Sequence, residues 1–152
     1  MFNFSNISGL FSRYLLFLIF LFCAFQLYAT QKVQVRILQT TDIHSFIEEG
    51  DNEGSGGWLR VATLIKKHRR EIGREHIILI DCGDTVQGSI SGVVTKGEAA
   101  VDLLNHLKYD FWILGNHELD FGIPQLSRLV AKSKVPILNG NFHLTEPFEQ
   151  QF

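Results

Sequence analysis

Three short apolar runs, each followed at once by polar residues, constrain the fold of this chain more than any other feature. The runs cover residues 33–39, 77–81 and 109–114. Each is short and rich in β-branched or aromatic residues, as buried strands are. The segments between the runs have helical periodicity, and strands that alternate with helices form βαβ crossovers around a mainly parallel sheet. The sequence therefore predicts an α/β fold.

The other elements continue this alternation. In chain order we expect a loop over residues 40–57, a helix over 58–72, a loop over 83–96 and a helix over 98–107. Pro124 is expected to open a last helix that runs to about Ser133, because proline is favoured in the first helical turn. A last strand is expected over residues 135–138, where Pro136 indicates an edge strand or an irregular strand start.

Polar residues of the kinds that bind metal ions follow each apolar run. They are Asp42 and His44, then Asp84, then Asn116, His117 and Asp120. Parallel strands direct their carboxyl ends to one edge of the sheet, where ligands bind in open α/β folds. Carboxylate, imidazole and amide groups together suit a borderline divalent metal such as Mn, Zn, Fe or Co. We therefore expect a metal site at this edge.

Each motif taken alone also fits an ordinary turn. Asp42 would then cap backbone N–H groups, and a Gly-Asp pair such as the one at Asp84 commonly ends a strand. In an extended backbone, by contrast, Asp42 and His44 would point to one face. His117 titrates near neutrality, and Asp120 would orient its imidazole and stabilise the protonated form. Because metal-binding residue types recur at three successive strand ends, the metal site is favoured over three unrelated turns.

The first 29 residues have the layout of a secretory signal peptide. An unbroken apolar run over residues 14–25 follows Arg13, and the small residue Ala29 stands at the cleavage position. The alternative is a retained anchor, but twelve apolar residues are too few, since a spanning helix needs roughly 20. A lipoprotein signal at Cys23 lacks the small residues expected before it. We therefore expect cleavage after Ala29, a periplasmic or secreted protein, and no stable membrane anchor.

Charge and cysteine content restrict the mature chain further. The sequence has 14 Lys and Arg residues and 16 Asp and Glu residues, and of these only Arg13 precedes residue 30. The densest positive stretch, residues 66–70, lies on the polar side of a predicted helix and indicates a solvated face, so no nucleic-acid partner is expected. Cys82 would be the one cysteine of the mature chain, which excludes an internal disulfide, and we expect it as a small core residue.

These motifs resemble the opening motif blocks of the calcineurin-like metallophosphoesterases. The blocks are residues 41–44, 81–89 and 114–122, and the resemblance extends over residues 33–141. Residues 56–62, 87–89 and 139–141 are similar to the branch of secreted 5′-nucleotidases and 2′,3′-cyclic nucleotide phosphodiesterases. The resemblance implies that residues 30–152 form the N-terminal part of a metallophosphoesterase α/β sandwich.

The resemblance also implies a role for each site residue. Asp42 and His44 would bind a first metal ion, Asp84 would bridge two ions, and Asn116 would bind the second. His117 would contact the phosphoryl group and protonate the leaving oxygen, with Asp120 as its partner. The implied function is hydrolysis of a nucleotide or another phosphoester by a metal-activated water, with two divalent ions as cofactors.

The sequence departs from the family in its later histidines. The family completes its site with an isolated His and a Gly-His-x-His segment, and neither pattern surrounds His68, His76, His106 or His143. We therefore expect the chain to be part of a longer enzyme, because four ligands are few for two ions. Two alternatives stay open: a non-catalytic or degenerate metal-binding fragment, and a related UDP-sugar hydrolase, cyclic-nucleotide phosphodiesterase or thiosulfohydrolase.

Overall fold

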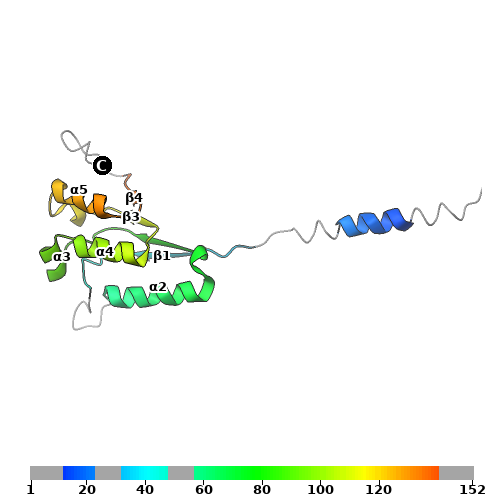
Figure 1. The fold of residues 1–152 in the computed structure, drawn as a ribbon, viewed down its shortest axis with the longest axis horizontal. Helices are drawn as coiled ribbons and strands as arrows, with labels where there is room; N and C mark the ends of the chain where they lie inside the picture. Colours follow the sequence, from blue (N-terminus) through cyan, green and yellow to red (C-terminus); the bar gives the residue numbers. More distant parts are fainter. Residues whose placement is uncertain (1–11, 23–31, 48–56, 141–152) are drawn as a thin grey trace, which may run out of the picture. The chain divides into compact units, whose positions relative to one another are not determined.

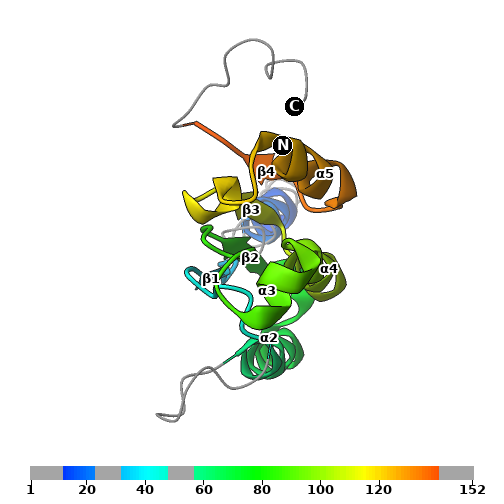
Figure 2. The ribbon, with the colours of Figure 1, turned by 90° about the vertical axis from the view of Figure 1, so that its left-hand side faces the viewer.

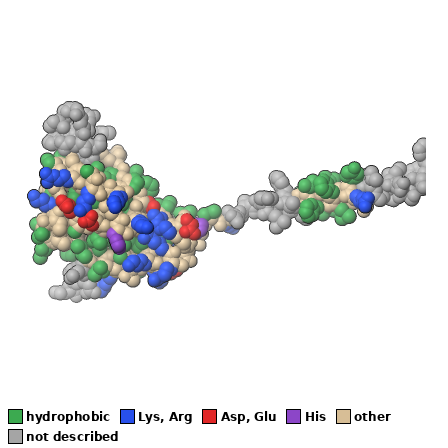
Figure 3. All heavy atoms as spheres, viewed as in Figure 1, with side chains coloured by type: hydrophobic (Ala, Val, Ile, Leu, Met, Phe, Trp, Pro, Cys, Tyr) green, Lys and Arg blue, Asp and Glu red, His purple; other side chains and the backbone are tan. Residues whose placement is uncertain are grey.

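The computed structural model describes residues 12–22, 32–47 and 57–140 (Figure 1). Contacts divide the chain into residues 1–34 and residues 35–152, and each unit is described by itself. In the first unit, residues 12–22 are helical and expose apolar side chains, drawn in green in Figure 3. Within the described ranges, we find no helix with the length and apolar character needed to span a bilayer. The signal peptide stays a prediction, and its cleavage site at Ala29 lies outside the described residues.

A four-stranded parallel sheet forms the centre of the second unit. Its strands, in spatial order, are β1 (Arg36–Thr40), β2 (Ile77–Asp81), β3 (Phe111–Ile113) and β4 (Ile137–Leu138). All three neighbouring pairs run parallel, which confirms the predicted α/β class. Strand β4 lies at the edge of the sheet, as Pro136 indicated. Strand β1 begins three residues later than predicted.

The longer helices confirm the predicted alternation. They are α2 (Trp58–Ile72), α4 (Glu98–Leu107) and α5 (Ile123–Lys132). The expectation of an uninterrupted loop over residues 83–96 was wrong, because it contains the short helix α3 (Ile90–Thr95). The Ser89 side chain caps α3 by accepting a hydrogen bond from the Gly92 N–H. Helix α3 has low intrinsic propensity, since four of its six residues are β-branched and one is glycine.

The two faces of the sheet differ in burial. Leu79 and Trp112 point to one face and are fully buried in the core, together with residues of the long helices such as Leu104 and Leu129. Figure 2 shows the helices gathered along the sheet. On the opposite face, Ile37 is 65% exposed. Parallel sheets are normally covered on both faces, so this apolar face is unusual for a parallel sheet.

A buried polar cluster lies where β2 ends. The Asp81 carboxylate is completely buried and accepts hydrogen bonds from the Thr40 hydroxyl at 2.6 Å, from the Gly83 N–H at 3.1 Å and from the Thr85 hydroxyl. Burial raises the pKa of Asp81 to about 6, against the hydrogen bonds that lower it. Cys82, the next residue, is only partly buried and has a free thiol, whose pKa burial raises.

Replacing Asp81 with asparagine should flatten the pH dependence of stability. The pKa of Asp81 in the folded protein, about 6, lies above its ordinary value of 3.8. Between these values the folded state keeps a proton that the unfolded state has released, so the free energy of unfolding falls as the pH rises. Denaturant unfolding at several pH values measures this. As the pH rises through this range, the free energy of unfolding of wild type should fall by up to about 3 kcal/mol relative to that of Asp81→Asn.

The matched control for this measurement is Asp102→Asn, because Asp102 is an exposed carboxylate on α4. This variant should keep the wild-type pH dependence. Parallel curves for wild type and Asp81→Asn would contradict the expectation.

Candidate metal centre

The segments that follow β1 and β2 continue side by side beyond the sheet. The backbone N–H groups of Asp42, His44 and Ser45 donate to the carbonyls of the second segment at 3.0, 3.0 and 2.8 Å. The accepting carbonyls belong to Gly83, Asp84 and Thr85. The segment after β3 joins them, because the His117 N–H donates to Asp84 Oδ1 at 2.9 Å. The three predicted motifs therefore meet at one edge of the sheet.

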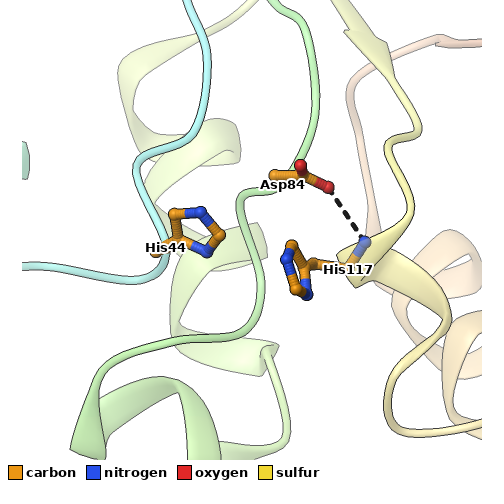
Figure 4. A group of neighbouring side chains, drawn as sticks. All are labelled: His44, Asp84 and His117. Carbon is orange, nitrogen blue, oxygen red and sulfur yellow. Dashed lines mark hydrogen bonds between the residues drawn. The ribbon is translucent and has the colours of Figure 1, made fainter.

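Three of the six predicted site residues form a compact group of possible metal ligands. His44, Asp84 and His117 each offer one ligand atom, and these atoms all lie within 4.8 Å of one another (Figure 4). The two imidazole rings meet edge to face, with 4.9 Å between their centroids. All three residues are partly exposed, so an ion can reach them from solvent.

A carbonyl group of the second loop orients His44. Nδ1 of His44 lies 2.9 Å from the Gln87 carbonyl oxygen, which can only accept, so this nitrogen carries the proton. The lone pair is then on Nε2, as a metal ligand requires. Gly88 lets the loop pass this closely, because its φ is +137° and a Cβ there would lie 2.5 Å from the His44 Cβ. No local sequence pattern predicts the contact of His44 with the Gln87 carbonyl or its close approach to Gly88.

Asp42 lies next to this group rather than in it. Of the two conformations considered for this motif, the turn forms and the extended backbone does not: φ is +54° at Asp42 and +51° at His44, both in the left-handed region. The hydrogen bonds to the loop after β2 hold this turn. Asp42 Oδ1 nevertheless lies 3.9 Å from His44 Nε2, and its other oxygen accepts from the Thr41 hydroxyl at 2.5 Å. The Asp42 side chain is 59% exposed.

The third motif forms a short 3-10 helix, η2 (His117–Leu119), directly after Asn116. Nδ1 of His117 lies 2.7 Å from Asp120 Oδ2. This hydrogen bond raises the pKa of His117, and the negative charges of Asp120, Asp84 and Glu118 act in the same direction. Asn116 caps η2, and its carbonyl accepts from the Leu119 N–H at 3.1 Å.

The chemistry of these donors fits a divalent metal ion. Two imidazole nitrogens and a carboxylate oxygen are ligands that borderline ions such as Zn²⁺ and Mn²⁺ accept. Asp42 and Asn116 add oxygen groups within the same loops. Of the other histidines, His68 contacts Glu71 on α2 and so lies outside this edge. His143 lies outside the described residues.

Comparison with known proteins gives matches over most of the chain. The family model described as calcineurin-like phosphoesterase matches residues 35–149. The chain is 34% identical over 128 residues to human 5′-nucleotidase. The aligned region covers 78% of this chain and 22% of that protein. It is 34% identical over 122 residues to the 2′,3′-cyclic-nucleotide 2′-phosphodiesterase/3′-nucleotidase of Haemophilus influenzae, covering 72% of this chain and 18% of that protein.

A solved structure of a calcineurin-like phosphoesterase is also similar to this chain. The calcineurin-like phosphoesterase YfkN from Bacillus subtilis superimposes with a TM-score of 0.62 and 32% identity, over 73% of this chain and 38% of that chain. The chain thus spans only about a fifth of the length of the curated relatives named above, at 22% and 18%.

Asp120→Asn should lower the pKa of His117. The neutral amide removes both the charge-assisted hydrogen bond and the carboxylate charge that favour the imidazolium. An NMR pH titration of the imidazole resonances in metal-free protein measures this shift. Asp102→Asn, which removes an exposed carboxylate that pairs with Lys132, should leave the His117 curve in place. Identical His117 curves for wild type and Asp120→Asn would contradict the assignment.

Proposed function

The chain belongs to the calcineurin-like phosphoesterase family, and on this premise we propose that it forms the N-terminal part of a metal-dependent phosphoester hydrolase acting on nucleotides. The observation that carries the proposal is the group of His44, Asp84 and His117 at the carboxyl ends of a parallel sheet. A nucleotide substrate is supported by the relatives, which are named as a 5′-nucleotidase and a cyclic-nucleotide phosphodiesterase/3′-nucleotidase.

We place residues 30–152 within a larger catalytic domain. The apolar face of the sheet supports this, because Ile37 and Leu138 are 65% and 47% exposed on it. A further layer packed on this face would bury both side chains, as expected for an α/β sandwich. The small share of each relative that the chain covers agrees with a larger domain.

The proposed site holds two divalent ions. Asp42 and His44 would hold the first, Asn116 the second, and Asp84 would be shared between them. The 3.9 Å between Asp42 Oδ1 and His44 Nε2 supports the first pair. When bound, the ions would supply Lewis-acid stabilisation of phosphoryl charge and a water of lowered pKa.

His117 is proposed as the general acid. Its Nδ1 is engaged by Asp120, so Nε2 is the ring nitrogen that can donate a proton to the leaving oxygen. The hydrogen bond to Asp120 raises the pKa of His117, as a general acid near neutral pH requires. A carboxylate in this position also orients imidazoles that bind metal ions, so the metal content of His117→Ala decides between the acid role and the alternative, in which His117 is a third ligand of the group.

Metal content and rate, measured on the same preparations, test the assignment of Asp84 as a shared metal ligand and of His117 as the general acid. Calorimetric titration of the chain with Mn²⁺ should show binding that Asp84→Ala abolishes, because a shared carboxylate serves both ions. For rates, the chain is extended at its C-terminus with the family's downstream histidine segments. His117→Ala should then lower kcat by about 10²- to 10⁴-fold while metal content stays nearly unchanged.

The substrate panel contains a nucleoside 5′-monophosphate, a 2′,3′-cyclic nucleotide and a UDP-sugar, which separates the related activities. Loss of metal together with activity in His117→Ala would make this residue a ligand. Mn²⁺ binding that is absent, or unaffected by Asp84→Ala, would refute the metal site.

We further propose that residues 1–29 direct export and are removed after Ala29. N-terminal sequencing of the protein recovered from the periplasm or medium of a bacterial host should begin at Thr30. Ala29→Trp should block processing, because signal cleavage requires a small residue at that position. A wild-type product that begins at Met1 or stays in the membrane fraction would refute this proposal.

A further inference from the structure

Glu118 carries a buried carboxylate to which the proposed function gives no task. It is 1% exposed. Its Oε1 accepts from the backbone N–H groups of Thr85 at 2.7 Å and Val86 at 3.3 Å. Its Oε2 accepts from those of Asp84 at 2.9 Å and Gly115 at 2.6 Å. Among the described residues no Lys, Arg or His forms an ion pair with it, so backbone amides stabilise its charge.

The amides that bind Glu118 come from an unusual backbone conformation. Gly83 and Asp84 both have positive φ, at +91° and +54°. This turns the successive N–H groups of Asp84, Thr85 and Val86 to one side, and such a concave row of amides binds anions. Aspartate adopts the left-handed conformation less readily than glycine, and the hydrogen bond from the Asp84 N–H to the Glu118 carboxylate stabilises it there.

The contact between the two loops runs in both directions. Glu118, from the loop after β3, accepts from the Asp84 amide, while the Asp84 carboxylate accepts from the His117 amide at 2.9 Å. One glutamate thus acts on the backbone of the residue proposed to be shared by both ions and on the loop that holds the proposed acid. Its own oxygens are occupied by amides, so it does not serve as a ligand.

We propose that Glu118 is the positioning residue of this site, an inference that rests on the proposed function. Its carboxylate fills the row of amides after β2, holds Asp84 in its left-handed conformation and fixes the distance between Asp84 and His117. Glutamine has the same shape, but its NH₂ group would face backbone N–H donors and lose their hydrogen bonds. Aspartate keeps the charge, but it is one methylene too short to reach the amides of both loops.

Metal titration with a matched control tests this role. The full chain is titrated with Mn²⁺ as wild type, Glu118→Gln, Glu118→Asp and Glu75→Gln. Glu75 is an exposed glutamate that also lies in a short 3-10 helix, η1 (Arg74–His76), before the start of β2. Glu118→Gln should weaken Mn²⁺ binding by about 10- to 100-fold, the range found for residues that orient ligands. Glu75→Gln should bind as wild type does.

A spectroscopic measurement separates positioning from loss of stability. At saturating Co²⁺, Glu118→Gln should show visible absorption bands that differ in position and intensity from those of wild type, because the ligand geometry has changed. A variant that is only less stable would reach the wild-type spectrum once saturated. Wild-type Mn²⁺ affinity or a wild-type Co²⁺ spectrum in folded Glu118→Gln would overturn the inference.

Hydrogen exchange on wild type decides the question if the Glu118 variants do not fold. Saturating Zn²⁺ should slow exchange of the Thr85, Val86 and Gly115 amides, which contact Glu118, since metal binding and Glu118 stabilise the same loop conformation. The amide of Leu79, a β2 residue whose N–H donates to the Asp110 carboxylate, should exchange at the same rate with and without Zn²⁺. Unchanged exchange at the three amides would overturn the inference. A wild type that binds no metal refutes the proposed function itself, so the two failures are distinguishable.

Discussion

Gly83 and Gly115 lie against each other where β2 and β3 end, and neither position has room for a Cβ. A Cβ on Gly83 would overlap the backbone of Gly115, and a Cβ on Gly115 would overlap the side chain and backbone of Asp84. This approach brings the loops after two parallel strands within hydrogen-bonding distance of each other. The Asp84 carboxylate therefore reaches the His117 amide, and this hydrogen bond joins the second and third loops of the site.

The same approach concentrates negative charge at one edge of the sheet. Asp81 and Glu118 are buried there, and the Asp84 carboxylate accepts from the His117 amide beside them. Burial raises the pKa of Asp81 and the Asp120 hydrogen bond raises that of His117, and the charge of Glu118 adds to both in the same direction. Anions held this close together favour cations at the surface above them, whether a divalent metal ion or an imidazolium. The buried negative charges thus favour the binding of cations at this edge, as the proposed function requires.

Local sequence patterns predicted most of the fold but not the backbone of the site. The bounds of α2, β2 and α4 follow from apolar periodicity, and the structure confirms them. Local sequence could not decide between a turn and an extended backbone at Asp42 and His44, because the turn is held by carbonyls of a loop about 40 residues away. The site residues could be named from their chemistry at strand ends. The roles of the Gln87 carbonyl and the Glu118 carboxylate could not be named in this way. The first is itself a backbone group, and the second contacts backbone N–H groups.

The site and the apolar core consist of different residues, so substitutions in the site leave the packing of the core intact. His44, Asp84 and His117 contribute nothing to the apolar core, which consists of residues such as Leu79, Trp112 and Leu104. Ligand side chains can therefore be replaced without opening a cavity in the core, because the cost of such substitutions comes from buried volume. Glu118 differs, since it is fully buried and also holds the ligand loops. The geometry of the site is thus linked to the stability of the fold through this carboxylate and its four amides.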